Sequence, residues 1–321
     1  MRNPEVLIPH RYIIALQLLK GFGNATVMYV LNYAISTSIP DNCHSMYHLI
    51  EGLTRDKSIR PTCPSLEEFI DALSRADEII RRSLSAGISM SSKYDSDFPR
   101  SLLATVDEKG RKSVPVMIYY KGDLTIINRP SLAIVGTRTP TIQGSYAASY
   151  FAEKFASEGV NIVSGLALGC DTSAHRGALF ARGLTTAVLA GGLDNISPNQ
   201  NASLAQEILD RGGLLISEKP VGSIVGAHDF VSRDRLQVAL SSATLVIQTN
   251  ALGGTMHAAN TTLAACKPLW VVGYKDLDEP QVKGNHLLLS KGASELTSAM
   301  YNADKEHYLS QLHSHQFLLD I

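Results

Sequence analysis

The most constraining feature of this sequence is a series of six short apolar runs that begins after residue 130. The runs are "LAIVG", "NIVSG", "TAVLAG", "LLISE", "TLVIQ" and "PLWVVG", and a segment of helical length separates each run from the next. Buried parallel strands have continuous apolar sequences, and crossover helices must connect them. The pattern therefore predicts an α/β fold, with a doubly wound parallel sheet and helices on both of its faces.

The remaining segments have different patterns. Residues 1–85 place apolar side chains three and four apart, which predicts a small N-terminal helical domain. Residues 86–130 are irregular apart from the strand-like "PVMIYY", so we interpret them as a connector and an outer strand. The sheet domain is predicted over residues 131–296, and residues 297–321 are predicted to form a C-terminal helical tail. With 321 residues and 45% hydrophobic content, the chain can bury a full core.

Charge and cysteine content exclude several classes of protein. The 29 basic and 30 acidic side chains give a net charge of -1, so any contact with nucleic acid must be a local patch. The four cysteines show no metal-binding spacing, and the first residues lack the layout of a signal peptide. Asp171 and His175 lie four residues apart, but two ligands do not make a metal site. We therefore expect a cytoplasmic protein that holds no metal. We also expect that it does not cross a membrane, because apolar runs of about 18 residues are absent.

The stretch "SLAIVGTRTPTIQG" at residues 131–144 has the order strand, glycine turn, helix. A dinucleotide site needs three glycines spaced GxGxxG and an acidic residue after the second strand. Only Gly136 and Gly144 are present, and the second strand ends in "SGLALG", so we expect no dinucleotide cofactor. A loop that opens a helix nevertheless suits a phosphate group, and Arg138 adds a positive charge. The alternative is a glycine that only makes the turn.

Two further strand ends repeat this arrangement, in "SGLALGCDTSAHRGAL" and "TNALGGTMHAANTTLAA". The carboxyl ends of parallel strands lie at one edge of a sheet, where open α/β folds bind ligands. Arg233 and Arg235 stand just before a predicted amphipathic helix, where they could equally be solvated. The candidate DNA- or phosphate-binding residues are Gly136, Thr137, Arg138, Ser164, Gly165, Gly169, Arg233, Arg235, Gly253, Gly254 and Thr255.

These motifs also occur in the order seen in a known family. From about residue 88 to 294 the segments "GISMSSKYDSDFPRSLL", "AIVGTRTPTIQG", "IVSGLALGCDTSAHRGAL", "FVSRDR" and "GNHLLLSKGA" resemble the DNA-processing protein A family, also called DprA or Smf. The segment "LQLLKGFGNATVMYVLNYA" resembles the helix-hairpin-helix of that family's sterile-alpha-motif-like domain, with Gly21 and Gly23 in the hairpin. The resemblance implies a Rossmann-like sheet domain preceded by a small helical domain.

The resemblance also implies a function. Members of this family bind single-stranded DNA in the cytoplasm, often as dimers, and help to load a RecA-like recombinase in natural transformation or recombination, without bond-breaking chemistry. By matched position, Arg138 would contact DNA phosphate, and Arg233 and Arg235 would line the same pocket. Ser164, Gly165 and Gly169 would shape its wall, and Gly253, Gly254 and Thr255 would form its anion loop. A homodimer would use the apolar "TLAACKPLWVV" segment.

Three residues depart from the family pattern. Leu184 stands where some members have a lysine for DNA, and Asp234 replaces the asparagine of the usual "RNR". His257 replaces an apolar residue in the anion loop. These departures keep a nucleotide sensor, for example in phage defence, as one alternative. A second is a nucleotide N-glycosidic hydrolase like the LOG enzymes, but the glutamate of their "GGxGTxxE" loop is missing from "GGTMHAAN".

Overall fold

The computed structural model describes residues 8–274 and 279–317, and it divides the chain into two compact units. The first unit comprises Met1–Phe98 with Pro115–Ile118, and the second comprises Pro99–Val114 with Tyr119–Ile321. Residues 318–321, the end of the predicted C-terminal helical tail, lie outside the described residues. Within the described ranges, no helix combines the length and the apolar character that a bilayer crossing requires.

The first unit is mostly helical, and a short strand follows its last helix. Its core is built from apolar faces that the helices turn toward each other, with Ile13, Leu31 and Phe69 fully buried. Gly21 turns the chain between the first two helices with a φ of +83°, a conformation that favours glycine. The elements are α1 (His10–Leu18), α2 (Asn24–Thr37), α3 (Cys43–Arg55), α4 (Leu66–Ser85) and β1 (Ser89–Ser92).

The segment after α4 is tied to these helices by polar contacts. Tyr94 donates a hydrogen bond from its hydroxyl to Asn32 Oδ1 at 3.1 Å, and His10 Nε2 lies 2.7 Å from Asp95 Oδ2. Residues 86–98 therefore group with the helical unit rather than with a separate connector. Local sequence patterns could not reveal this, because each contact joins residues more than 60 positions apart.

All six apolar runs form parallel strands, which confirms the predicted α/β fold. The strand-like "PVMIYY" segment forms β2, which pairs antiparallel with β6. The sheet order is β1-β2-β6-β5-β4-β3-β7-β8-β9, and β1 and β9 were not predicted. The strands are β2 (Met117–Gly122), β3 (Ser131–Val135), β4 (Asn161–Ser164), β5 (Thr185–Leu189), β6 (Leu214–Ser217), β7 (Ala243–Val246), β8 (Leu269–Val272) and β9 (Ser294–Leu296).

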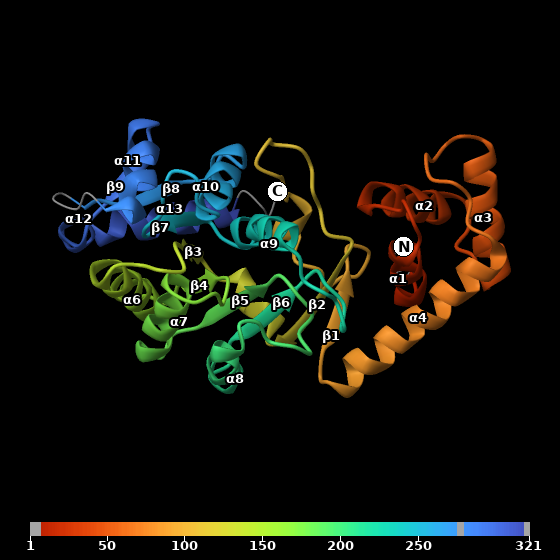
Figure 1. The fold of residues 1–321 in the computed structure, drawn as a ribbon, viewed down its shortest axis with the longest axis horizontal. Coiled ribbons are helices and arrows are strands. Elements are labelled where there is room, and N and C mark those ends of the chain that lie inside the picture. Colours follow the sequence, from red (N-terminus) through yellow and green to blue (C-terminus); the bar gives the residue numbers. More distant parts are fainter. Residues whose placement is uncertain (1–7, 275–278, 318–321) are drawn as a thin grey trace. The chain divides into compact units, whose positions relative to one another are not determined.

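Helices cover both faces of this sheet (Figure 1), and each face has its own apolar core. Phe155 and Trp270 stack in one core, and Val238, Met256 and Leu288 lie in the other. The helices are α5 (Arg100–Leu103), α6 (Ile142–Ser157), α7 (Cys170–Phe180), α8 (Ala202–Asp210), α9 (Ala227–Ala239), α10 (Thr255–Ala264), α11 (Lys283–Ser290), α12 (Ser298–Ala303) and α13 (Lys305–Phe317). Short 3-10 turns occur at Leu124–Asn128, Asn199–Asn201 and Pro280–Val282.

The segment predicted as a C-terminal tail, residues 297–321, is part of the second unit. It contains α12 and α13, and Tyr301, Leu309 and Leu312 are buried in the same core as Phe155. The face of the sheet that carries α6 and α7 is thus closed by the last two helices.

Candidate functional site

The candidate site lies where the strand order reverses. β3 pairs with β4 on one side and with β7 on the other, so the loops that follow these strands diverge at their carboxyl ends. A cavity of about 310 Å³ lies there. Of the predicted residues, the structure brings Gly136, Thr137, Arg138, Arg233, Gly253, Gly254 and Thr255 to its lining.

The start of α10 offers free hydrogen-bond donors to this cavity. Gly254 is the N-cap residue and no side chain caps the helix, so the backbone N–H groups of Gly254 and Thr255 have no protein acceptor among the described residues. The glycines allow a tight loop, since a Cβ on Gly253 would lie 2.8 Å from Asn250 Oδ1. An uncapped helix N-terminus with exposed N–H groups is an anion-binding element.

The other two predicted anion loops donate some of their backbone N–H groups to the protein itself. At the start of α6, Thr141 accepts a hydrogen bond from Gly144 N at 3.1 Å and donates its own N–H to Gln248 at 2.9 Å. At the start of α7, Cys170 donates its N–H to Thr137 O at 3.2 Å. Contacts within the protein thus take up part of the backbone donors of these two loops, whereas the start of α10 keeps the N–H groups of Gly254 and Thr255 without an acceptor among the described residues.

Arg138 lies at the mouth of the cavity with an aromatic neighbour. Its guanidinium carbon is 4.8 Å from the centre of the Phe230 ring, a cation–π distance. Phe230 belongs to α9 and also lines the cavity. Sequence analysis did not identify Phe230, because one phenylalanine within "HDFVS" carries no periodic signal. The pair presents a positive charge and a ring face together.

Arg233 is buried, whereas the sequence placed it just before a helix and left a solvated position open as the alternative. It lies within α9, is 8% exposed, and donates from Nη1 to the carbonyls of Gly165 and Val188 at 2.6 Å each. A Cβ on Gly165 would collide with this guanidinium group. Arg233 Nη2 has no protein acceptor among the described residues, so this nitrogen is the one available to a ligand.

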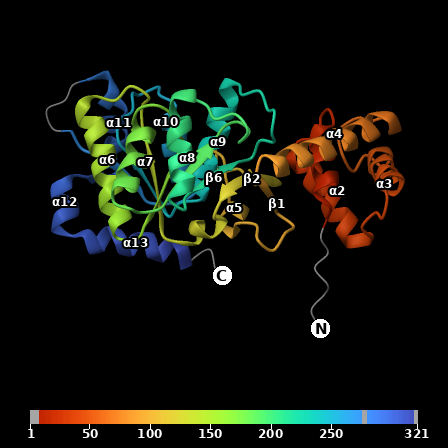
Figure 2. The ribbon, with the colours of Figure 1, turned by 90° about the horizontal axis from the view of Figure 1, so that it is seen from below.

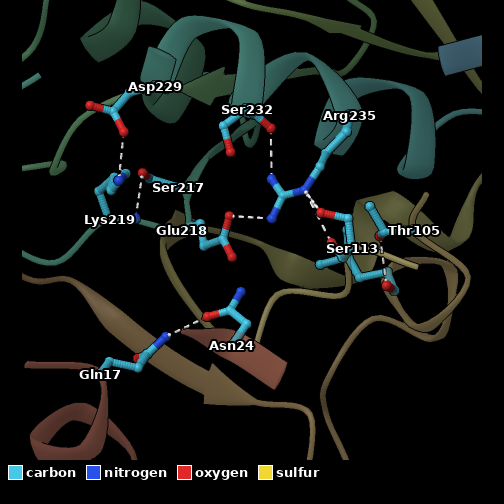
Figure 3. A network of polar contacts seen from close by, with 11 residues as sticks. Gln17, Asn24, Thr105, Ser113, Ser217, Glu218, Lys219, Asp229, Ser232 and Arg235 are labelled. Carbon is cyan, nitrogen blue, oxygen red and sulfur yellow. Dashed lines mark hydrogen bonds and ion pairs between the residues drawn. The ribbon is translucent and has the colours of Figure 1, made fainter. Parts of the chain in front are cut away.

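Arg235 does not line the cavity. It lies 2.6 Å from the Glu218 carboxylate and donates to the carbonyls of Ser113 at 3.0 Å and Ser232 at 2.6 Å (Figure 3). Its side chain is 7% exposed, so its charge is matched inside the protein. Arg233 and Arg235 therefore face different surroundings, because side chains two residues apart on an α-helix point about 200° apart around its axis.

Ser164, Gly165 and Gly169 do not line the cavity. The two glycines pack against residues that do. Ser164 donates its hydroxyl to Ile134 O at 2.7 Å in the sheet. Gly169 has a φ of +85°, and a Cβ there would lie 2.5 Å from Thr137 O. These residues hold the loop that carries Arg138 against the start of α7.

Two carboxyl groups share the cavity with the two arginines, at Asp171 and Asp234. Burial raises the pKa of Asp234 to about 6, while the neighbouring Arg233 opposes this shift. Burial also raises the pKa of Asp171, again opposed by Arg233. When both carboxyl groups are ionised, they cancel the charge of the arginines, so anion binding depends on their protonation.

Three other residues singled out in the sequence do not line this cavity. His175 is fully buried and contacts Thr185 Oγ1 at 2.7 Å through Nδ1, and burial lowers its pKa to about 3. Leu184 precedes β5, so it lies at the opposite edge of the sheet from the cavity. His257 Nδ1 lies 2.7 Å from Glu108 Oε2. Of the three, His257 alone is close enough to Asp234 to affect its charge.

Comparisons with known proteins agree with the arrangement of these elements. The family model described as DNA recombination-mediator protein A matches residues 89–305. Protein Smf of Escherichia coli K12 is 34% identical over 204 residues, which cover 63% of this chain and 53% of that protein. The DNA processing protein DprA of Bacillus subtilis is 31% identical over 186 residues, which cover 58% and 62%. The matched region thus spans about half to two thirds of these relatives.

Solved structures show the same fold. The X-ray structure of DNA processing protein A from Streptococcus pneumoniae has a TM-score of 0.74 at 25% identity, and the match covers 92% of this chain and 98% of that one. The protein from Helicobacter pylori, whose structure is described as showing a single-stranded DNA binding mode, has a TM-score of 0.58 at 27% identity and covers 69% and 96%. Sequence and structure together place this chain in the DNA recombination-mediator protein A family.

Proposed function

We propose that this protein binds single-stranded DNA in the cytoplasm, without breaking a bond in it, and that the cavity at the β3–β7 edge holds one of its phosphate groups. The observation that carries the proposal is the convergence of Arg138, Phe230 and the uncapped start of α10. The α10 N–H groups and Arg138 suit phosphate oxygens, which occur in every sequence. The ring of Phe230 suits an unstacked base.

An aromatic face beside a phosphate site favours single strands over duplex DNA. Bases in a duplex are stacked on each other, so a side chain at the backbone cannot reach their faces. The cavity of about 310 Å³ also admits only a small part of a nucleic acid, such as a phosphate with its sugar or base. We therefore expect binding with little sequence preference and strong salt dependence.

The test is a titration of labelled oligonucleotides followed by fluorescence anisotropy. Single-stranded dT25, a matched duplex and free mononucleotides are compared at the same ionic strength. We expect the single strand to bind most tightly and mononucleotides to compete weakly. The proposal fails if the duplex binds as tightly as the single strand, or if neither binds at micromolar protein.

One alternative is supported by the two carboxyl groups of the cavity. Asp234, whose pKa is about 6, could serve as a general acid beside a bound nucleotide. This arrangement favours a nucleotide sensor or an N-glycosidic hydrolase over an inert pocket. Incubation with nucleoside monophosphates, followed by chromatography of the free base, separates the cases. Saturable mononucleotide binding without oligonucleotide affinity would favour the sensor, and release of base the hydrolase.

The resemblance to the DprA family further leads us to propose a homodimer and a RecA-like recombinase as partner. The "TLAACKPLWVV" segment offers less apolar surface than its sequence suggests. Trp270 is 2% exposed in the core, while Leu263 is 45% exposed. A dimer through this region would therefore use the end of α10 rather than β8.

A further inference from the structure

A second basic site lies on the other side of the second unit, in a groove between α7 and α8. The groove has a volume of about 520 Å³ and is lined by Arg176, Leu179, Phe180, Arg182, Glu207 and Arg211. Figure 2 shows the two helices side by side on one face of the sheet. Three arginines face one glutamate, so this groove carries an excess of about two positive charges, although the whole chain has a net charge of -1.

The three arginines are not matched by the protein. Arg176, Arg182 and Arg211 are exposed, and within the described ranges their guanidinium groups form no hydrogen bond or ion pair. Arg235, by contrast, is buried against Glu218. Guanidinium groups that surround one groove repel each other until an anion lies between them, and their forked donors fit phosphate oxygens.

The same groove exposes an aromatic ring. Phe180 is the last residue of α7 and is 79% exposed. The ring is therefore accessible to a base from solvent. Basic side chains with an interleaved ring are the combination that binds single-stranded nucleic acid, through backbone charge and base stacking.

α7 connects this groove to the candidate site. Asp171 in its first turn lines the cavity at the β3–β7 edge, and Phe180 at its end lines the groove. The helix has 11 residues. It is therefore about 16 Å long, which corresponds to roughly five nucleotides at a stacked spacing of about 3.4 Å. A strand held in the cavity needs only a few more nucleotides to reach the groove.

We propose that the α7–α8 groove is a second contact for the backbone and bases of the same DNA single strand, an inference that rests on the proposed function of the cavity. Arg176, Arg182 and Arg211 bind its phosphates, and Phe180 stacks on one of its bases. The positions of Arg182 and Arg211 just after helix ends have a competing explanation, because cations stabilise helix C-termini. That explanation does not apply to Arg176, which lies within α7.

The experiment compares dT3 with dT25 for the full-length protein and three variants. The variants are the triple change R176Q/R182Q/R211Q, the single change Phe180→Ala, and Arg129→Gln as a control exposed arginine outside the groove. Each lost phosphate contact lowers the log-log salt slope by about 0.7 for single strands, so the triple variant should lose about 2. Its affinity for dT25 at 0.1 M salt should fall by about fivefold per arginine.

Binding of dT3 should be unchanged in the triple variant, because about three nucleotides at the stacked spacing are shorter than α7 and cannot reach from the cavity to the groove. Phe180→Ala should weaken dT25 binding at least about fivefold without changing the salt slope, since the ring carries no charge. Arg129→Gln should match the wild type at both lengths. Loss of both lengths in Arg138→Ala would report on the cavity, so failure of the proposed function is distinguishable from failure of the groove.

A triple variant that binds dT25 with wild-type affinity and salt slope would overturn the proposal. If that variant also has a lowered melting temperature, the arginines act at the helix ends instead. The single variant Arg176→Gln is measured as well, in case the triple variant does not fold. It leaves both helix ends unchanged and should still lower the log-log salt slope for dT25.

Discussion

The ionisation of Asp234 sets how readily the cavity accepts an anion, and Asp234→Asn tests this directly. The Asp234 carboxylate lines the cavity, and its Oδ1 lies 3.1 Å from Arg233 Nε. Its side chain is 15% exposed, and burial raises its pKa to about 6. A bound phosphate adds a second negative charge next to this carboxylate. Binding is therefore favoured when Asp234 holds a proton.

The size of the effect follows from this pKa of about 6. Roughly one molecule in ten holds the proton at pH 7, and roughly nine in ten hold it at pH 5. An anion that selects the protonated form gains about tenfold in apparent affinity between pH 7 and pH 5, or about 1.4 kcal/mol. The asparagine variant has no charge to remove. It should bind about tenfold more tightly than the wild type at pH 7, and its affinity should vary less with pH than that of the wild type.

The assay is anisotropy with rhodamine-labelled dT25 from pH 5 to pH 8 at constant ionic strength. Arg233, Asp171 and His257 also influence the pKa of Asp234. His257→Gln is therefore measured alone and together with Asp234→Asn. The part of the pH dependence that Asp234→Asn removes in both backgrounds belongs to the carboxyl group.

The variant should fold normally. Because the pKa of Asp234 is raised, its contribution to stability is present below about pH 4 and is lost as pH rises through about 6. Asparagine stays uncharged at every pH, so the variant does not suffer this loss of stability at pH 7. Arg233 keeps an acceptor, since the amide oxygen of Gln237, turned toward it, lies 2.8 Å from Nε. Equal affinity of variant and wild type at pH 7, with parallel pH profiles, would refute the reasoning.

Four further predictions concern single residues and assembly. Arg138→Ala should lower single-strand affinity for every sequence and reduce the salt slope by about 0.7, with an unchanged melting temperature, because Arg138 is exposed. Arg233→Ala should lower the free energy of unfolding by about 3 to 5 kcal/mol in calorimetry, since it leaves two carbonyls and Asp234 without their partner; a variant as stable as the wild type would contradict its buried role. Lys267 donates to the carbonyls of Val238, Ala239 and Ser241, so Lys267→Met should cost about 1 to 3 kcal/mol in chemical denaturation. Sedimentation at tens of micromolar should show a dimer, which Leu263→Glu weakens; a strict monomer would count against the homodimer.

The sequence by itself was sufficient for the parallel strands and for one uncapped helix start. Six apolar runs became six strands, because a strand buried on both faces must be continuously apolar. The glycines before Thr255 predicted the start of α10 and its free N–H groups, since both depend on neighbouring residues only. β1 and β9 escaped prediction because "SMSS" and "SEL" are short and polar, and their strand character comes from pairing partners.

Tertiary structure decided which of the predicted groups can reach a ligand. Arg233 and Arg235 look alike in "SRDR", yet one meets the carbonyls of Gly165 and Val188 and the other meets Glu218. A guanidinium group binds whatever acceptor the fold brings to it, and these acceptors come from 17 to 68 residues away along the chain. Phe230 gained its place beside Arg138 in the same way. Local sequence fixes backbone conformation, whereas the partner of a long polar side chain depends on how distant segments pack.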